Sequence, residues 1–215
     1  MHLSLIGMAG SGKSYWSQKL AEHGFRRFCC DDMIEAKLVP ELTKSDGTMM
    51  KVAEWMGFPY EPHYQECESQ YLAYEAEVLT EILDYLENGE NNPGENIVVD
   101  TTGSVIYIGE EILGRLQGYT TIVYLATPPE VQEQLLNAYI SNPHPMLWRG
   151  AFSREPNETN EEAIARCYPR LFFARKRLYE RYADVTIDYY RRREQGFGVT
   201  DFLRAVEVSK GEAPR

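Results

Sequence analysis

A glycine-rich stretch near the start of the chain restricts the possible folds more than any other segment. This stretch, GMAGSGKS at residues 7–14, lies between a short apolar run at residues 3–7 and a segment with helical spacing at residues 13–23. Two glycines separated by four residues and followed by lysine and serine match the whole pattern of a phosphate-binding loop, in the strand–loop–helix context that the pattern requires. The stretch therefore predicts an α/β fold that binds a nucleoside triphosphate.

The residue types of this loop suit the binding of a polyphosphate. Glycines let backbone N–H groups curl around phosphate oxygens in conformations that most side chains forbid, and the helix N-terminus adds a partial positive charge. We expect Lys13 to reach the β- and γ-phosphates of ATP, taken as the default triphosphate, and the Ser14 hydroxyl to ligate Mg²⁺. The predicted nucleotide-binding residues are Gly7, Gly10, Ser11, Gly12, Lys13, Ser14 and Tyr15.

Apolar runs alternate with helical segments along the rest of the chain. Further strands are predicted at residues 26–30, 97–100, 120–127 and 185–188. Helices are predicted at residues 31–38, 66–88, 108–116, 130–140, 161–183 and 200–208. Pro40 is expected to end the first of these helices, and Pro169 to kink or restart the fifth. Such alternation favours a parallel sheet with right-handed crossovers. We therefore expect one three-layer α/β/α domain over residues 1–215, with a five-stranded parallel sheet.

Three segments interrupt the alternation. Residues 39–66 contain several Gly and Pro and are expected to form a substrate-side insertion, with a short helix at residues 49–58. Residues 88–96 form a polar loop. Residues 141–160, rich in Pro, Gly, Asn and charge, are the lid candidate, because a lid excludes water and thereby prevents hydrolysis of the transferred phosphate. An ordinary solvated loop is the alternative for the last segment.

The charge balance bears on the partners. The chain has 22 Lys and Arg against 33 Asp and Glu, and a formal net charge of −11. This surface repels nucleic acid and anionic membranes at long range, so we expect a small molecule with a hydroxyl group as the partner. No apolar run approaches the ~20 residues of a membrane span, and no signal peptide precedes the first strand, so the expected location is the cytoplasm. The four cysteines match neither a disulfide framework nor a zinc pattern, and the sequence makes no prediction of the oligomeric state.

Carboxylates follow two of the predicted strands, where ligands gather in an open α/β sheet. Asp31 would accept the proton of an attacking hydroxyl or hold that hydroxyl in line, whereas helix capping is the alternative for it or its neighbour Asp32. Asp100 closes the run NIVVD, which is typical of a Walker B strand whose carboxylate orients Mg²⁺ or its water; a plain strand end is the alternative. Thr101, Thr102 and Ser104 follow it, with Gly103 among them, and their hydroxyls and backbone amides are expected to line the acceptor pocket.

Cations occur in the lid candidate and in the helix after it. One of His144 and Arg149 would stabilise the charge of the transferring phosphoryl group, as an arginine finger does. On the following helix, a 3.6-residue period places Arg175 about 160° from Arg177. We therefore expect most cations of this helix to be solvated, and one or two to point inward at phosphate.

These motifs together resemble the shikimate kinase family, within the nucleoside-monophosphate-kinase-like P-loop proteins. GMAGSGKS matches that family's P-loop, DDMIE looks like its second-strand motif, YLAYEAEVL resembles its F-R-x-x-E helix, and VVDTTGSV stands at its triple glycine. HPML stands at its R-P-L-L lid motif, and ARKRLYERYADVTID is similar to its closing R-x-P-x-Y…A-D…I-D stretch. The resemblance implies that Asp31 is the substrate-binding aspartate and that Arg175 binds the substrate carboxylate.

The chain departs from this family at several of its functional positions. Leu72 stands where the family has a substrate-binding arginine, Cys29 where it has the first acid of D-x-D, and His144 where it has the lid arginine. Only Gly103 remains of the triple glycine. An anionic acceptor loses much of its anchor when a bidentate arginine becomes aliphatic, so we expect a related kinase with a different acceptor.

The N-terminal part also resembles another family. Residues 10–35 look like the start of polynucleotide 5′-hydroxyl kinases, which again implies Asp31 as the acceptor-activating carboxylate. A small-molecule kinase is the favoured reading; a polynucleotide or nucleoside 5′-hydroxyl kinase and a nucleotide-binding switch without transferase activity are the alternatives. The predicted catalytic residues are Lys13, Asp31 and Arg149, the metal-binding residues Ser14 and Asp100, and the acceptor-binding residues Asp31, Thr102, Gly103, His144 and Arg175.

Overall fold

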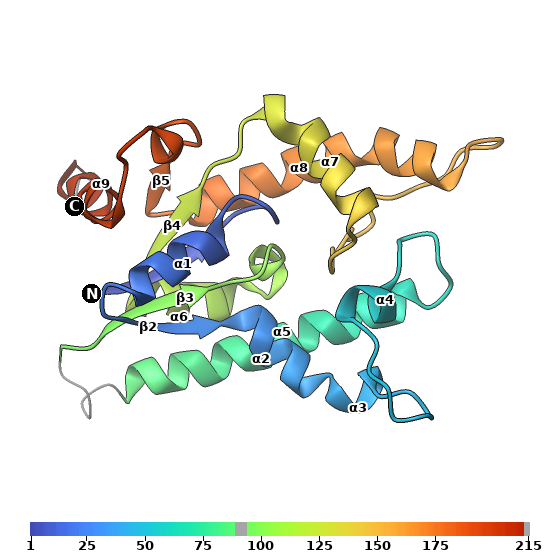
Figure 1. The fold of residues 1–215 in the computed structure, drawn as a ribbon, viewed down its shortest axis with the longest axis horizontal. Helices are drawn as coiled ribbons and strands as arrows, with labels where there is room; N and C mark the ends of the chain where they lie inside the picture. Colours follow the sequence, from blue (N-terminus) through green and yellow to red (C-terminus); the bar gives the residue numbers. More distant parts are fainter. Residues whose placement is uncertain (89–93, 213–215) are drawn as a thin grey trace.

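The computed structural model describes residues 1–88 and 94–212, so most of the polar loop expected at residues 88–96 lies outside the described residues. Its centre is a five-stranded sheet in the order β2-β3-β1-β4-β5 (Figure 1). All four strand pairs are parallel, which confirms the predicted sheet. The strands are β1 (His2–Ile6), β2 (Phe25–Cys29), β3 (Asn96–Asp100), β4 (Thr121–Leu125) and β5 (Val185–Ile187).

Helices cover both faces of the sheet. Side chains alternate between the two faces along each strand, so Leu5 packs in one apolar cluster with Trp16, whereas Ile6 packs in the other with Leu79. The first cluster is closed by α1 (Lys13–Ala21) and α9 (Val199–Glu212). The second is closed by α5 (Tyr64–Glu87), α6 (Glu110–Tyr119) and α8 (Asn160–Tyr182). Burial on both faces explains the continuous apolar runs of the strands, and the predicted three-layer α/β/α fold is confirmed.

Short helices complete the chain between the main elements. They are α2 (Cys30–Lys37), α3 (Val39–Leu42), α4 (Val52–Met56), α7 (Gln132–Ser141) and the 3₁₀ turns η2 (Val105–Tyr107), η3 (Pro129–Val131) and η4 (Arg191–Arg193). Figure 1 shows α5 and α8 extending past the sheet, with α4 beside α5 and α7 beside α8 at the far end. No helix within residues 1–88 and 94–212 is both long enough and apolar enough to cross a membrane.

Helix α2 ends before Pro40, as expected, whereas the restart expected at Pro169 as an alternative to a kink does not occur. Helix α2 ends at Lys37 before Pro40 is reached, and Pro40 lies in the first turn of α3, where its missing N–H removes no helical hydrogen bond. Helix α8 continues through Pro169 and does not restart there. The helix expected at residues 49–58 is the shorter α4. Residues 142–159 form neither helix nor strand, as expected for the lid candidate.

The strand register brings the candidate site together. In the sheet, Leu5 of β1 and Cys29 of β2 both lie opposite Asp100 of β3. The three strands therefore end at nearly the same level. The loop after β1, the first turn of α2 and the segment after β3 all start from this edge, which is where ligands bind in open α/β sheets.

Candidate functional site

The loop after β1 has backbone geometry that requires glycine. Gly7, Gly10 and Gly12 have φ angles of 146°, 79° and 100°, which side chains rarely adopt. A Cβ atom on Gly7 would lie 2.9 Å from Oγ of Ser11 and 3.0 Å from the carbonyl oxygen of Leu125. Gly12 directly precedes α1, and no side chain of residues 1–88 or 94–212 caps that helix end, so the first N–H groups of α1 stay available to a ligand.

Lys13 is held against its own loop. Its Nζ donates to the carbonyl oxygens of Gly7, at 2.9 Å, and Met8, at 3.2 Å. An ammonium has three N–H donors, so one remains for another acceptor. Burial lowers the pKa of Lys13, and the nearby charges of Asp31 and Asp100 oppose that effect. Two hydrogen bonds to its own loop thus hold the Lys13 side chain in place, so that it does not extend freely into solvent.

A cavity of about 450 Å³ opens beside this loop. The loop and α1 contribute Gly10, Gly12, Lys13, Ser14 and Tyr15 to its lining. The facing segments contribute the five predicted acceptor-binding residues, which are Asp31, Thr102, Gly103, His144 and Arg175. Gly7 and Ser11 shape the loop but do not line the cavity. The two sets of residues predicted for nucleotide and acceptor therefore surround one space.

Asp31 lies in the first turn of α2 and reaches solvent through the cavity. Its Oδ1 accepts a hydrogen bond of 3.1 Å from the hydroxyl of Tyr71, a buried residue of α5. Because protein atoms surround the carboxyl, burial raises its pKa, while the charge of Lys13 and the hydrogen bond from Tyr71 lower it in part. The Asp31 carboxyl therefore has its Oδ1 held by Tyr71 and a pKa above its usual value.

Glu75 lies one helical turn after Tyr71 and is fully buried behind the cavity wall. Its Oε2 accepts a hydrogen bond of 2.6 Å from the Ser104 hydroxyl, and its Oε1 accepts one from the Thr102 hydroxyl. Burial raises the pKa of Glu75 to about 7, although the two hydroxyls favour its charged form. A single face of α5 thus positions both Asp31 and the hydroxyls that follow β3.

Arg175 joins the wall of the cavity to the lid candidate. This side chain is 2% exposed, and its terminal nitrogens donate to the carbonyl oxygens of Gly103, at 3.1 Å, and Leu147, at 2.7 Å. Its Nε has no hydrogen-bond partner among the described residues. The guanidinium also lies 5.6 Å from the ring centre of Tyr107. The carbonyl of Gly103 receives a second hydrogen bond, of 2.5 Å, from Tyr179.

His144 lines the cavity as a neutral imidazole at neutral pH. Burial lowers its pKa to about 4, and the charges of Arg175 and Lys13 act in the same direction. Its Nε2 is buried without a hydrogen-bond partner among the residues that the structure describes. His144 therefore brings a neutral polar group, and not a cation, to the place where an arginine finger was considered.

Besides Gly7 and Ser11, the predicted residues Asp100 and Arg149 lie outside the cavity lining. Asp100 is buried, and its Oδ2 accepts hydrogen bonds from Ser17, at 2.9 Å, and from Arg27, at 2.7 Å; its Oδ1 has no partner within the described parts of the chain. Arg149 is exposed, and its guanidinium lies 5.8 Å from the ring centre of Tyr107. Its backbone N–H donates to Glu68. The metal role of Asp100 and the catalytic role of Arg149 stay predictions.

Solved structures share this architecture. Shikimate kinase from Acinetobacter baumannii in complex with shikimate matches 100% of this chain and 95% of that chain, with a TM-score of 0.60 and 22% sequence identity. Shikimate kinase from Bacteroides thetaiotaomicron matches 97% of this chain and 93% of that chain, with a TM-score of 0.54 and 16% identity. The fold is that of the shikimate kinases. No family model matches the chain, and no curated protein matches it in sequence.

The shikimate kinase-like fold thus extends over the whole chain, as the motifs predicted. Because both identities are below 25%, this likeness concerns the fold, and the acceptor is a separate question. The similarity of residues 10–35 to polynucleotide 5′-hydroxyl kinases stays a prediction.

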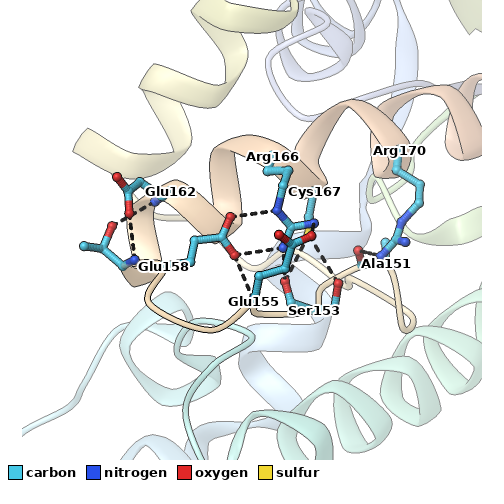
Figure 2. A network of polar contacts seen from close by, with 9 residues as sticks. Ala151, Ser153, Glu155, Glu158, Glu162, Arg166, Cys167 and Arg170 are labelled. Atoms are coloured by element: carbon cyan, nitrogen blue, oxygen red, sulfur yellow. Dashed lines mark hydrogen bonds and ion pairs between the residues drawn. The ribbon is translucent and has the colours of Figure 1, made fainter.

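The lid candidate of this fold is fastened to two helices. Figure 2 shows Arg166 of α8 paired with Glu158, at 2.7 Å, and donating to the carbonyl oxygen of Ser153, while Arg170 donates to the carbonyl oxygen of Ala151. At the other end, the Tyr64 hydroxyl donates to the Met146 carbonyl and accepts from the N–H of Trp148. Only residues 144–147 of this segment line the cavity.

Sequence reasoning missed one clamp on the loop. Arg192 of η4 is buried and donates to the carbonyl oxygens of Ser11, at 3.1 Å, Ala126, at 2.7 Å, and Ile187, at 2.8 Å. Burial lowers its pKa to about 10, so it is still charged at neutral pH. The arginine run at residues 191–193 was visible in the sequence, but nothing there distinguished the buried member from its exposed neighbours.

Tyr71 and Glu75 were also missed as site residues. Both lie on the apolar face of α5, where a carboxylate is unusual because an unpaired buried charge is costly. The position of Glu75 on this apolar face was therefore the feature of the sequence that could have indicated a buried polar site.

The residues at the cavity suit a metal that arrives with a polyphosphate. Within residues 1–88 and 94–212, no three His, Cys, Asp or Glu side chains are grouped to hold a metal ion by themselves. Mg²⁺ usually keeps several waters and takes only one or two protein ligands beside the phosphates. The Ser14 hydroxyl, which lines the cavity, meets that smaller requirement.

Proposed function

We propose that this chain is an ATP-dependent kinase that transfers the γ-phosphoryl group to a hydroxyl of a small molecule. One observation carries the proposal: Lys13 and Asp31, which follow two different strands, line the same cavity. A fixed cation suits the phosphates, and a carboxylate suits the attacking hydroxyl. A P-loop kinase needs both groups beside one space.

The loop would bind the donor. The N–H groups between Met8 and Ser14 would surround the phosphates, and the free N–H of Lys13 would reach the transferred group. Ser14 would hold Mg²⁺, and Asp100 would orient it or its water. Mg²⁺, when bound, would neutralise part of the phosphate charge.

Asp31 would act on the acceptor. Tyr71 occupies its Oδ1, and the carboxylate keeps further lone pairs for an acceptor hydroxyl. Asp31 would hold that hydroxyl in line with the phosphate and accept its proton. Thr102, Gly103 and Arg175 would line the acceptor side.

The lid candidate would cover the reacting atoms. His144 and the residues up to Leu147 border the cavity, and Arg175 ties Leu147 to the opposite wall. Exclusion of water from this space would favour transfer over hydrolysis. Arg149, one residue past the buried Trp148, would approach the phosphates only after a local change, because its side chain now lies near Tyr107.

A second cavity supports a nucleoside triphosphate rather than a bare polyphosphate. This cavity, of about 370 Å³, shares Gly12 and Tyr15 with the first and is bounded by Trp16, Arg193 and Phe197. Aromatic rings beside a phosphate loop suit the flat face of a base. We assign the nucleoside to this side of the loop.

The experiment that tests this proposal measures donor binding and transfer separately. Calorimetry with a non-hydrolysable ATP analogue is expected to show magnesium-dependent binding. Incubation with ATP and a panel of sugars, polyols, hydroxy acids, nucleosides and a 5′-hydroxyl oligonucleotide is expected to yield a phosphoester of a small molecule. Asp31→Asn should abolish transfer but keep nucleotide binding, whereas the neighbouring Asp32→Asn, outside the cavity lining, should keep both. Absence of magnesium-dependent affinity for any purine triphosphate would overturn the proposal, and labelling of the oligonucleotide alone would favour the 5′-hydroxyl kinase.

A further inference from the structure

The two hydroxyls on the acceptor side of the cavity have their protons turned away from it. Thr102 and Ser104 line the cavity, and when Glu75 is ionised each donates its one O–H proton to that buried carboxylate. The backbone N–H of Ser104 also points inward, to Oγ1 of Thr102. A hydroxyl that donates inward keeps only lone pairs for a ligand. Both side chains therefore offer the cavity hydrogen-bond acceptors.

The other oxygen atoms of this wall are acceptors as well. Asp31 is a carboxylate, and Glu35 of α2 places a second carboxylate at the cavity lining. The carbonyl oxygen of Gly103 already accepts from Arg175 and Tyr179. We call Asp31, Glu35, Thr102 and Ser104 the acceptor wall. A ligand that touches this wall is stabilised by bringing O–H or N–H donors to it.

The cations at the cavity are engaged elsewhere. Lys13 faces the loop carbonyls and the phosphate side. Each terminal nitrogen of Arg175 already donates one N–H to a backbone carbonyl, so two of its five N–H groups are used by the protein. Among the residues that the structure describes, Nε of Arg175 has no hydrogen-bond partner although the side chain is only 2% exposed, and one N–H suits a hydroxyl oxygen. His144 is neutral.

From this arrangement we infer that the acceptor is a compound with several hydroxyls that is uncharged or carries an amine, such as a polyol or amino sugar, and not a hydroxy acid. Its hydroxyls would donate to Asp31, Thr102 and Ser104 and one of its oxygens would accept from Nε of Arg175. A ligand carboxylate at the acceptor wall would bring its oxygen lone pairs against those of Thr102 and Ser104. It would also bring its negative charge against the carboxylates of Asp31 and Glu35. The inference rests on the proposed kinase function, because it names the acceptor of that same site.

Matched ligand pairs that differ in charge test the inference. The probes are shikimate against its methyl ester, and gluconate against glucose and glucosamine, titrated into protein saturated with magnesium and a non-hydrolysable ATP analogue. At about pH 8.5 Glu75, with a pKa of about 7, is ionised. We expect the uncharged or amine-bearing members to bind roughly 10- to 100-fold more tightly than the acids, the range for buried polar groups left unpaired. Equal or tighter binding of the acids, or no binding by either series, overturns the inference, whereas nucleotide binding in the same titrations reports on the proposed function.

A substitution behind the wall gives a second test. Glu75→Gln exchanges one oxygen acceptor for an N–H donor, so one of the two hydroxyls must turn its proton toward the cavity. The preference for the ester over the acid is expected to fall several-fold, while Glu77→Gln, at an exposed carboxylate of α5 outside the cavity lining, should leave it unchanged. Ser104→Ala, which removes a wall oxygen, should weaken the binding of glucose but not of gluconate, and serves if Glu75→Gln does not fold. An unchanged preference in both variants contradicts the inference.

Discussion

The hydroxyl of Tyr71 donates a hydrogen bond of 3.1 Å to Oδ1 of Asp31, across 40 residues of sequence. A hydrogen bond to the charged form of a carboxyl lowers its pKa. Burial raises the pKa of Asp31, and this contact limits the increase. Tyr71 therefore helps to determine the pH range in which Asp31 is ionised.

The first prediction concerns this contact. Tyr71→Phe removes the bond to the charged carboxylate, so the pKa of Asp31 should rise and the acidic limb of the kcat/KM profile should move to higher pH. Tyr74→Phe is the matched control, because Tyr74 on the same helix donates to Glu41 instead. A profile that loses amplitude in Tyr71→Phe but keeps the position of its acidic limb would assign Tyr71 a packing role only.

The second prediction concerns the loop cation. Lys13→Met keeps most of the side-chain volume but removes the charge directed at the phosphates, and kcat/KM should fall by roughly 10²- to 10³-fold, the usual loss for one transition-state donor. Lys19→Met, at a position further along α1, removes a surface cation paired with Glu22 and should leave kcat/KM within about twofold of the parent. Steady-state kinetics on both variants, with circular dichroism to verify folding, makes the comparison. Similar losses in the two variants would refute a specific role for Lys13.

The third prediction concerns the clamp on the loop. Arg192→Leu leaves the buried carbonyls of Ser11, Ala126 and Ile187 without their donor. The free energy of unfolding should fall by about 2–4 kcal/mol, and nucleotide affinity should fall with it because Ser11 belongs to the phosphate loop. Arg191→Leu, at the exposed neighbour, should change stability by no more than about 0.5 kcal/mol. Denaturant titration and calorimetry measure the two effects, and equal destabilisation by the two variants would count against the clamp.

The fourth prediction concerns the pH dependence of stability. The pKa of Glu75 is raised from 4.5 to about 7, so the folded state holds its proton where the unfolded state has lost it. The stabilisation this gives is complete below about pH 4.5 and disappears as pH rises through 7, a change of about 3 kcal/mol.

Thermal unfolding between pH 5 and pH 8 tests that prediction. Glu75→Gln cannot ionise, so its stability relative to the parent should increase as pH rises. Glu77→Gln, at an exposed position of α5, controls for the loss of one charge from the helix. If the Tm values of the parent and Glu75→Gln change in parallel across this range, the carboxyl of Glu75 does not titrate as described.

Much of the fold was predictable from local patterns. The loop at residues 7–14 restricts the chain to a strand, a turn and a helix, and runs such as NIVVD mark strands buried on both faces. Parallel strands bring their carboxyl ends to one edge, so Asp31 and Thr102 were expected near Lys13 without knowledge of the strand order. Helix ends near Pro40 were less predictable, because proline suits the first turn of a new helix as well as the end of an old one.

The contacts that tune the site were not predictable. Asp100 is paired with Arg27, 73 residues away, and Glu75 with Ser104, 29 residues away. No period or motif encodes such a pairing, since it depends on which turn of one helix faces which strand end. Arg175 shows the same limit: helical spacing separated it from its neighbours, but only the fold reveals that its terminal nitrogens are already engaged.

Arg166 and Arg170 fix residues 151–158 to the long helix α8, while Trp148 is enclosed by the rings of Tyr139, Phe152 and Tyr168. Of this segment, only residues 144–147 then border the cavity. Entry of a ligand past this short segment would require a local backbone rearrangement, within nanoseconds to microseconds, rather than the movement of a whole domain. The protein would therefore exchange small ligands while its overall shape stays almost constant.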